Sequence, residues 1–115
     1  MASPDKSARV KELLVDTGSE YSWLPEAILT SIGIEVRKPK LQFVMANGDL
    51  IVRDVGYALL RVDGFETVDE VVFAEDADLH LLGSRTLEGF GATIDASRKQ
   101  LVASGPRLAA AIAKK

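Results

Sequence analysis

An acidic residue follows a short apolar run and stands just before a glycine, in the segment Leu13-Leu14-Val15-Asp16-Thr17-Gly18-Ser19. Three consecutive apolar residues predict a strand that is buried on both faces. The glycine and serine after Thr17 favour a tight turn that ends this strand. The sequence therefore places the Asp16 carboxylate at a strand end, where a rigid backbone can present a catalytic group to a substrate. The structural alternative is that Asp16 only opens an Asx turn.

The scarcity of cysteine and histidine restricts the kinds of catalytic and metal site that this chain can form. The 115-residue chain has no cysteine and one histidine, His80, which argues against cysteine nucleophiles, thiolate metal sites and histidine-based triads. The net charge of -3 and the scattered Lys and Arg residues argue against nucleic acid as a partner. A hydrophobic content of 47% and a charged content of 27% are typical of one globular domain. Catalysis, if present, must depend mainly on carboxylates.

The division of the chain follows from its composition. No apolar run approaches the roughly 18 residues that span a bilayer, and the polar start lacks the apolar core of a signal peptide. We therefore expect a soluble, cytoplasmic protein with no membrane partner. We interpret residues 1–12 as an N-terminal arm or a truncated first strand, residues 13–104 as the folded domain, and residues 105–115 as an alanine-rich tail with helical propensity.

Turn signals predict two successive hairpins. Leu41 to Met45 and Leu50 to Val55 flank Asn47-Gly48, and the runs before and after Asp63-Gly64 are also apolar. Both dipeptides favour tight turns because their residues tolerate positive φ. The hairpins predict a curled antiparallel sheet, and the tip at Asn47-Gly48 could also close over a ligand.

Other segments give shorter elements. We expect a strand at Tyr21 to Leu24 with Trp23 in the core, and a helix from Pro25 to Ile32 that ends at Gly33. The acidic stretch Glu75 to Asp78 lacks calcium-loop spacing and is interpreted as a solvated turn. His80 is interpreted as a structural or surface residue. The remaining predictions are a helix capped by Ser84 or Thr86 through Phe90, ended by Gly89 and Gly91, and a hairpin that pairs residues 92–95 with 100–103.

The order of these features resembles the retropepsin-like aspartic proteases, which are single-lobe, homodimeric proteins. Val15 to Ser19 resembles their hydrophobic-Asp-Thr-Gly-Ser/Ala turn, and Leu81-Leu82-Gly83 resembles their second hydrophobic-hydrophobic-Gly element, with Thr86 to Glu88 similar to the following helix. The resemblance covers roughly Leu13 to Val102. It implies an all-β fold, a small closed antiparallel β-barrel with one or two short helices. It also implies these site residues: Asp16 as the catalytic acid; Thr17, Gly18 and Ser19 as support for its loop; Met45, Ala46, Asn47, Gly48 and Asp49 as a flap tip that binds substrate; and Leu81, Leu82 and Gly83 beside the active-site loop.

The resemblance implies a peptide hydrolase with no metal and no organic cofactor. The chain contains one Asp-Thr-Gly, so a second carboxylate must come from another copy of the chain. The expected partners are therefore the protein itself, as a homodimer, and a peptide or protein substrate. Ser19 is expected to donate a hydrogen bond to the ionised carboxylate and lower its pKa.

Two other interpretations remain. The first is a retropepsin-like domain that acts as a dimerisation or peptide-binding module with little or no proteolysis; the carboxylate pair argues against it because such a pair is costly for a pure binder. The second treats Asp16-Thr17-Gly18 as the phosphate turn of an actin-like fold, which would need long alternating helices that this chain is too short to supply.

Overall fold

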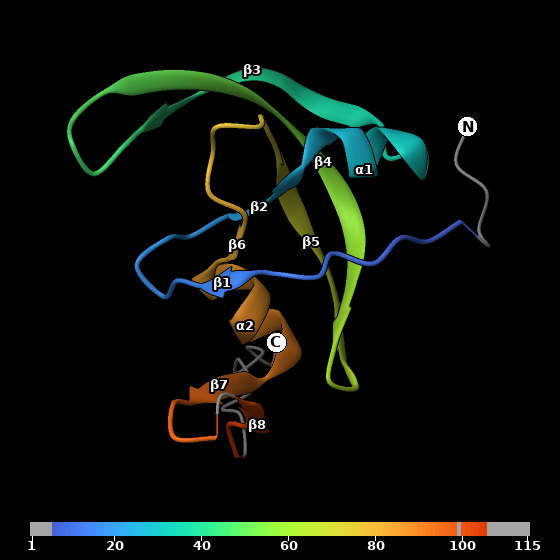
Figure 1. Cartoon of the computed structure of the whole chain (residues 1–115), viewed down its shortest axis with the longest axis vertical. Helices are drawn as coiled ribbons and strands as arrows, with labels where there is room; N and C mark the ends of the chain where they lie inside the picture. Colours follow the sequence, from blue (N-terminus) through green and yellow to red (C-terminus); the bar gives the residue numbers. More distant parts are fainter. Residues whose placement is uncertain (1–5, 99, 106–115) are drawn as a thin grey trace, which may run out of the picture.

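Strands dominate residues 6–98 and 100–105, which are the residues that the computed structural model of the protein describes (Figure 1). In chain order the elements are β1 Leu14–Val15, β2 Ser22–Pro25, α1 Glu26–Ser31, β3 Val36–Val44, β4 Leu50–Val62, β5 Phe65–Ala74, β6 Leu81–Leu82, α2 Ser84–Phe90, β7 Ala92–Asp95 and β8 Gln100–Ala103. No helix within those described ranges is both long and apolar enough to cross a membrane.

The strands form two sheets. The larger has the order β1-β6-β2-β5-β4-β3, and β7 pairs with β8 in a separate two-stranded sheet. The all-β prediction is confirmed, since 48% of the described residues are in strands and 13% in helices. The closed antiparallel barrel is not found in the described part of the chain, and two strand pairs, β1 with β6 and β2 with β5, are parallel. Tight turns fix only the pairing of neighbours along the chain, so they could not predict these long-range parallel pairs.

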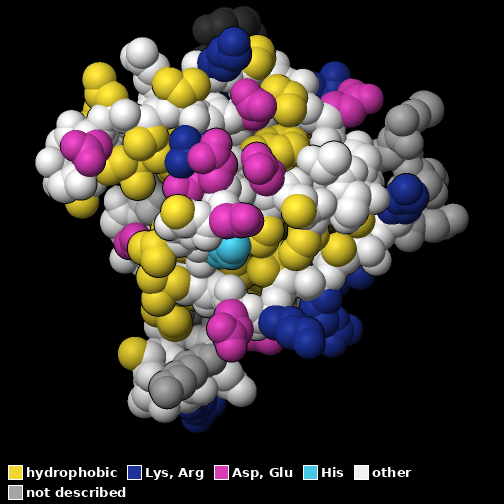
Figure 2. All heavy atoms as spheres, turned by 45° about the horizontal axis from the view of Figure 1, so that its top comes forward, with side chains coloured by type: hydrophobic (Ala, Val, Ile, Leu, Met, Phe, Trp, Pro, Cys, Tyr) yellow, Lys and Arg dark blue, Asp and Glu magenta, His cyan; other side chains and the backbone are white. Residues whose placement is uncertain are grey.

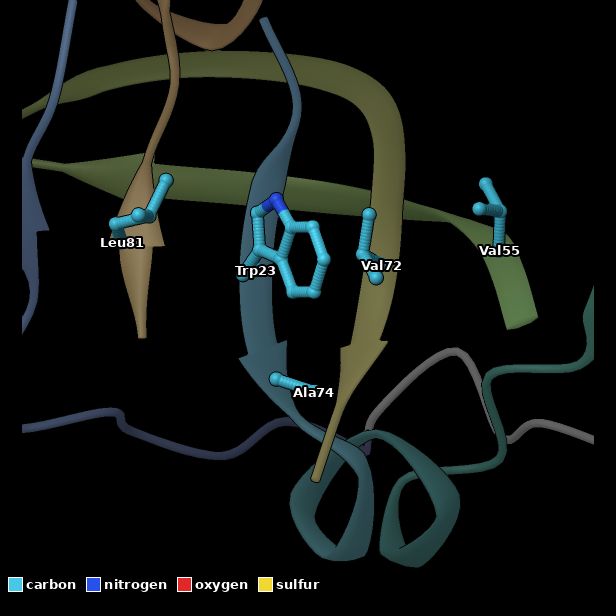
Figure 3. Close-up of a cluster of buried hydrophobic side chains, with 5 residues drawn as sticks. All are labelled: Trp23, Val55, Val72, Ala74 and Leu81. Carbon is cyan, nitrogen blue, oxygen red and sulfur yellow. The ribbon is translucent and has the colours of Figure 1, made fainter. Parts of the chain in front are cut away.

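The core lies on both faces of the long sheet. On one face Trp23, Val55, Val72, Ala74 and Leu81 pack together, with Trp23 of β2 between the flanking strands (Figure 3). This confirms that Trp23 belongs to the core. The second face is filled by another buried cluster, whose members are Leu24, Leu29, Ala58, Val71 and Phe73.

β1 differs from the predicted buried strand. Leu14 is 55% exposed, whereas Leu13 and Val15 are half-buried. β1 stands at the edge of the larger sheet and pairs with β6 alone, so an apolar run here did not mean burial on both faces.

The two hairpin turns use different backbone geometry. Asp63 and Gly64 both have positive φ, at 50° and 84°, as the sequence predicts. At the other turn only Gly48 does, at 89°. Asn47 instead uses its side chain: its Oδ1 accepts the Asp49 N–H at 2.9 Å and its Nδ2 donates to the Asp49 carboxylate at 3.0 Å. The side-chain bonds of Asn47 therefore stabilise this turn without the positive φ that the sequence analysis expected at both residues.

The helix boundaries follow the predicted segments, with one difference in capping. α1 begins after Pro25 and ends one residue before Ile32, close to prediction. α2 has Gly83 as its N-cap with no side-chain cap bond, so capping by Ser84 or Thr86 is wrong, because both residues lie inside the helix. Gly91 ends α2 in the left-handed conformation at φ 69°, whereas Gly89, which was also predicted to end the helix, lies inside it. The final hairpin is confirmed by the β7–β8 pairing, whereas the predicted helical tail from residue 107 lies outside the described residues.

Candidate active site

Asp16 follows β1 directly, and its backbone is fixed from two sides. Its N–H donates to the Leu82 carbonyl at 2.9 Å, and its own carbonyl accepts the Ser19 N–H at 3.2 Å. The carboxylate oxygen Oδ1 accepts the Gly18 N–H at 2.9 Å. This is the contact of an Asx turn, and the same bond orients the carboxylate, so the structural alternative and a catalytic role are compatible. Asp16 is half-buried and the turn residues Thr17 and Gly18 are exposed, which leaves the acid accessible from outside.

Gly18 lies close to the Asp16 carboxylate. A Cβ built on it would lie 3.2 Å from Asp16 Oδ1, tighter than nine in ten real Cβ contacts. A side chain at this position would therefore press on the carboxylate.

The second apolar element runs beside the Asp16 turn. β6 pairs with β1 in parallel, with Val15 opposite Leu82, and with β2 in the antiparallel sense, with Trp23 opposite Leu81. A Cβ on Gly83 would lie 2.4 Å from the Tyr21 carbonyl oxygen, so only glycine lets the chain pass β2 here. Leu81, Leu82 and Gly83 thus lie between the strand that ends at Asp16 and the strand that follows it.

Ser19 does not act as the sequence suggested. Its hydroxyl donates to the Tyr21 carbonyl at 2.9 Å. A hydroxyl has one proton, so this bond leaves none for the Asp16 carboxylate. The expected hydrogen bond from Ser19 to the Asp16 carboxylate is therefore not made, and Ser19 stabilises the loop instead.

Thr17 lines a pocket of about 520 Å³ at the foot of the active-site loop. Its walls are mainly apolar and come from α2 and β7, including Leu87, Ala92 and Ile94. Ile94 is 43% exposed. Thr17 is therefore next to an open apolar surface and not inside the core.

A buried hydroxyl chain that the sequence did not reveal supports Gly83. Thr86 Oγ1 donates to Asp69 Oδ2 at 2.9 Å, so in its 2.5 Å contact with Ser22 the donor must be Ser22. The Ser22 oxygen in turn accepts the Gly83 N–H at 2.9 Å. Ser22 and Thr86 are both fully buried. The only sequence signal was Ser22, a hydroxyl residue within the apolar segment Tyr21 to Leu24.

The predicted hairpin tip, Met45 to Asp49, projects from the sheet and all five of its residues are exposed (Figure 1). Hydrogen bonds join these residues to one another: Met45 N–H to the Asp49 carbonyl and Gly48 N–H to the Met45 carbonyl, both at 2.8 Å. Next to the tip, the hairpin packs against the start of β2, since the centroid of the Phe43 ring is 5.4 Å from that of Tyr21 and 5.2 Å from that of Trp23.

Charged pairs attach both hairpin strands to the rest of the protein. On β3, Lys38 Nζ lies 2.6 Å from Glu70 Oε2, and Arg85 of α2 lies 3.1 Å from the other Glu70 oxygen. The Lys38 bond lowers the pKa of Glu70, and the same bond raises the pKa of Lys38. The Arg85 guanidinium also stacks 5.0 Å above the Tyr21 ring.

On β4, Arg53 forms an ion pair with Asp78, which lowers the pKa of that carboxyl. Asp78 is therefore not part of a purely solvated turn, because its side chain is only 12% exposed. The turn prediction missed a partner 25 positions away in the chain. Acidic side chains gather in the middle of the face that carries this hairpin, whereas Lys and Arg lie mostly toward its edges (Figure 2).

Among the residues that the structure describes, no group of three or more His, Asp or Glu side chains could hold a metal ion. His80 lies half-buried just before β6, and its carbonyl accepts the Leu14 N–H at 3.2 Å. This main-chain bond connects β1 with the residue before β6.

One family model, described as "gag-polyprotein putative aspartyl protease", matches residues 7–89. The match includes the Asp16 turn, the β3–β4 hairpin and the Leu81-Leu82-Gly83 element. Neither a curated protein nor a solved structure gives a significant match to the chain.

Proposed function

Because the chain belongs to the gag-polyprotein aspartyl protease family, we propose that it is an aspartic endopeptidase whose active site forms between two copies of the chain. The observation that carries the proposal is the Asp16 turn, in which a carboxylate at a strand end is oriented by the Gly18 N–H and held against β6. The family match covers this turn.

The reaction requires two carboxylates. Two carboxylates about 3 Å apart cannot both ionise cheaply, so they share one proton. The ionised carboxylate takes a proton from a bound water that attacks the scissile carbonyl, while the protonated one gives its proton to the developing oxyanion. When the tetrahedral intermediate collapses, the first carboxyl passes the water-derived proton to the leaving nitrogen, and the second takes a proton back from a hydroxyl of the intermediate, which restores the shared proton. With one Asp-Thr-Gly in the sequence, the second group would be Asp16 of another copy on a two-fold axis.

The pocket beside Thr17 supports a homodimer. Thr17 belongs to the active-site turn, and the pocket walls are apolar and open. β7 and β8 pair only with each other in the described sheets, so their outer edges are available for strands of a second copy. Dimerisation here would bring the two Asp16 turns close together.

The substrate would be an extended peptide that binds between the β3–β4 hairpin, acting as a flap, and the Asp16 turn. The backbone of an extended peptide can pair with strand-like edges, and the exposed apolar residues of the hairpin, such as Val44 and Leu50, favour apolar side chains near the scissile bond.

A peptide-library digest at several pH values tests the proposal. We expect cleavage at acidic pH that is blocked by a statine-type inhibitor and lost in Asp16→Asn, with sedimentation showing a dimer. Asp76→Asn removes an exposed carboxylate from the β5–β6 turn and should keep full activity. Retained cleavage in Asp16→Asn would refute the catalytic assignment. Binding of peptides without any cleavage by the unmodified chain would instead identify a peptide-binding module.

A further inference from the structure

Arg53 makes the most enclosed ion pair that involves the β3–β4 hairpin. Its Nε lies 2.7 Å from Asp78 Oδ2 and its Nη2 lies 2.8 Å from Asp78 Oδ1. The two side chains are only 15% and 12% exposed. Asp78 Oδ2 also accepts the Glu75 N–H at 2.8 Å, which orients the carboxylate, and Glu75 Oε1 lies 3.4 Å from the guanidinium. Two parallel charge-assisted bonds in a partly buried site are much stronger than an ordinary surface pair.

Arg53 lies on the part of β4 that does not pair with β5. β4 pairs with β5 only from Val55 onward, where Val55 lies opposite Val72. The preceding part of β4, residues 50–54, pairs with β3 alone. The distal hairpin, residues 41–53, therefore leaves the six-stranded sheet as a two-stranded ribbon, and such ribbons have little stability of their own.

The backbone changes direction where this ribbon begins. The β3–β4 register is interrupted between Lys38 and Leu41, and Lys40 has a φ of 54°, which is rare for a residue with a side chain. The Lys40 N–H is bound by Asp54 Oδ1 at 3.0 Å. An interrupted ladder next to a left-handed residue provides a natural hinge.

We propose that the Arg53–Asp78 pair is a latch that holds the distal hairpin against the β5–β6 turn, and that its opening lets the hairpin lift about the Lys40 hinge. The latch connects two segments. One is β4, which follows the hairpin tip, and the other is the Asp78 turn, which precedes β6, the strand that pairs with β1 before Asp16. Arg53 and Asp78 are positioning residues, and their effect on substrate entry rests on the proposed protease function.

The Arg53 bond also affects the pH range in which the Asp78 carboxylate is charged. The Arg53 bond is the main cause of the lowered pKa of Asp78, so the carboxylate stays ionised below the usual Asp range. The other charged groups that act on the pair are Glu75, Glu26 and His80. The pair therefore stays charged to a lower pH than an unpaired aspartate would allow.

Trp23 reports hairpin position without any substrate. It is the only tryptophan, is 7% exposed, and packs against Phe43 of β3. In Asp78→Asn, which keeps the shape and the acceptor for the Glu75 N–H, we expect acrylamide quenching of Trp23 to rise at least about twofold. Amide exchange over residues 42–52 should accelerate roughly tenfold, as expected for loss of a charge-assisted pair. Arg53→Lys, which keeps the charge without the planar fork, should give an intermediate effect.

Glu66→Gln is the matched control. It neutralises the partner of Arg61, a second Arg–carboxylate pair on β4, whose side chains are 70% and 43% exposed. We expect no change in quenching or in hairpin exchange. Unchanged quenching and exchange in Asp78→Asn, or an equal change in Glu66→Gln, would overturn the latch.

Kinetics separate the latch from the proposed function. If the chain cleaves peptides, Asp78→Asn should raise KM about fivefold or more with kcat nearly unchanged, because substrate binding under the hairpin is weakened. A fold defect would lower kcat through loss of active protein. If the chain cleaves nothing, the quenching and exchange results still decide the latch.

Discussion

Gly83 provides the sharpest test of how the candidate site is built. In Gly83→Ala the new Cβ would lie 2.4 Å from the Tyr21 carbonyl oxygen and 2.6 Å from that of Glu20. Ordinary van der Waals contact begins at 3.4 Å, so these atoms must separate by about 1 Å. Both are backbone atoms of the segment between Asp16 and β2, and no rotamer change can relieve the clash.

The cost can be estimated from the bonds that this separation strains. Three of them are the Gly83 N–H to Ser22, the Ser84 N–H to Ser19 at 2.7 Å and the Arg85 N–H to Glu20 at 3.2 Å. Each is worth about 1 kcal/mol, and overpacking adds about 1 to 3 kcal/mol. We expect the free energy of unfolding to fall by about 4 to 6 kcal/mol, a large part of the 5 to 15 kcal/mol typical of a domain.

Urea unfolding followed by Trp23 fluorescence measures this loss at fixed protein concentration. Gly64→Ala is the control: Gly64 has a φ of 84° but nothing within 4 Å of a built Cβ. That variant should lose only about 1 kcal/mol, the cost of a left-handed alanine. Since the φ of Gly83 is -93°, alanine has no backbone penalty there. A loss in Gly83→Ala no larger than that in Gly64→Ala would refute the claim that close approach determines this position.

Two further predictions concern buried polar groups. Thr86→Val should lower the free energy of unfolding in urea by about 1 to 3 kcal/mol, because Ser22 loses its acceptor and Asp69 loses a donor. Thr30→Val, at an exposed position of α1, should change it by no more than about 0.5 kcal/mol. Equal losses in the two variants would contradict the hydroxyl chain. The folded-state pKa of Asp78 is lowered, so its ionised form stabilises the fold above the unfolded-state pKa, and this contribution is lost as pH falls through the folded value. The stability gap between the unmodified protein and Asp78→Asn should therefore persist at pH 5 and close only below the ordinary Asp range, and a gap that closed near neutral pH would count against the ion pair.

The local elements were predictable because their signals are local. Asp63-Gly64 specifies its turn through backbone angles, Gly91 ends α2 through its left-handed conformation, and the residues around Trp23 favour a strand. The location of Asp16 at a strand end also followed from its neighbours. The parallel pairing of β1 with β6 joins residues 67 positions apart, as in Leu14 with Leu81, and no turn signal reports it.

Arg53 and Arg61 show why polar contacts were harder to predict. Both are arginines on β4, both face a carboxylate, and nothing in the surrounding sequence ranks one above the other. Arg61 pairs across the sheet with Glu66, five positions away, which hairpin register makes foreseeable, and this pair is exposed. Arg53 reaches a turn that only the tertiary fold brings near, and there the ion pair is enclosed. The strength of an ion pair depends on the water that the fold removes, so the energetically important pair was the one that local sequence could not identify.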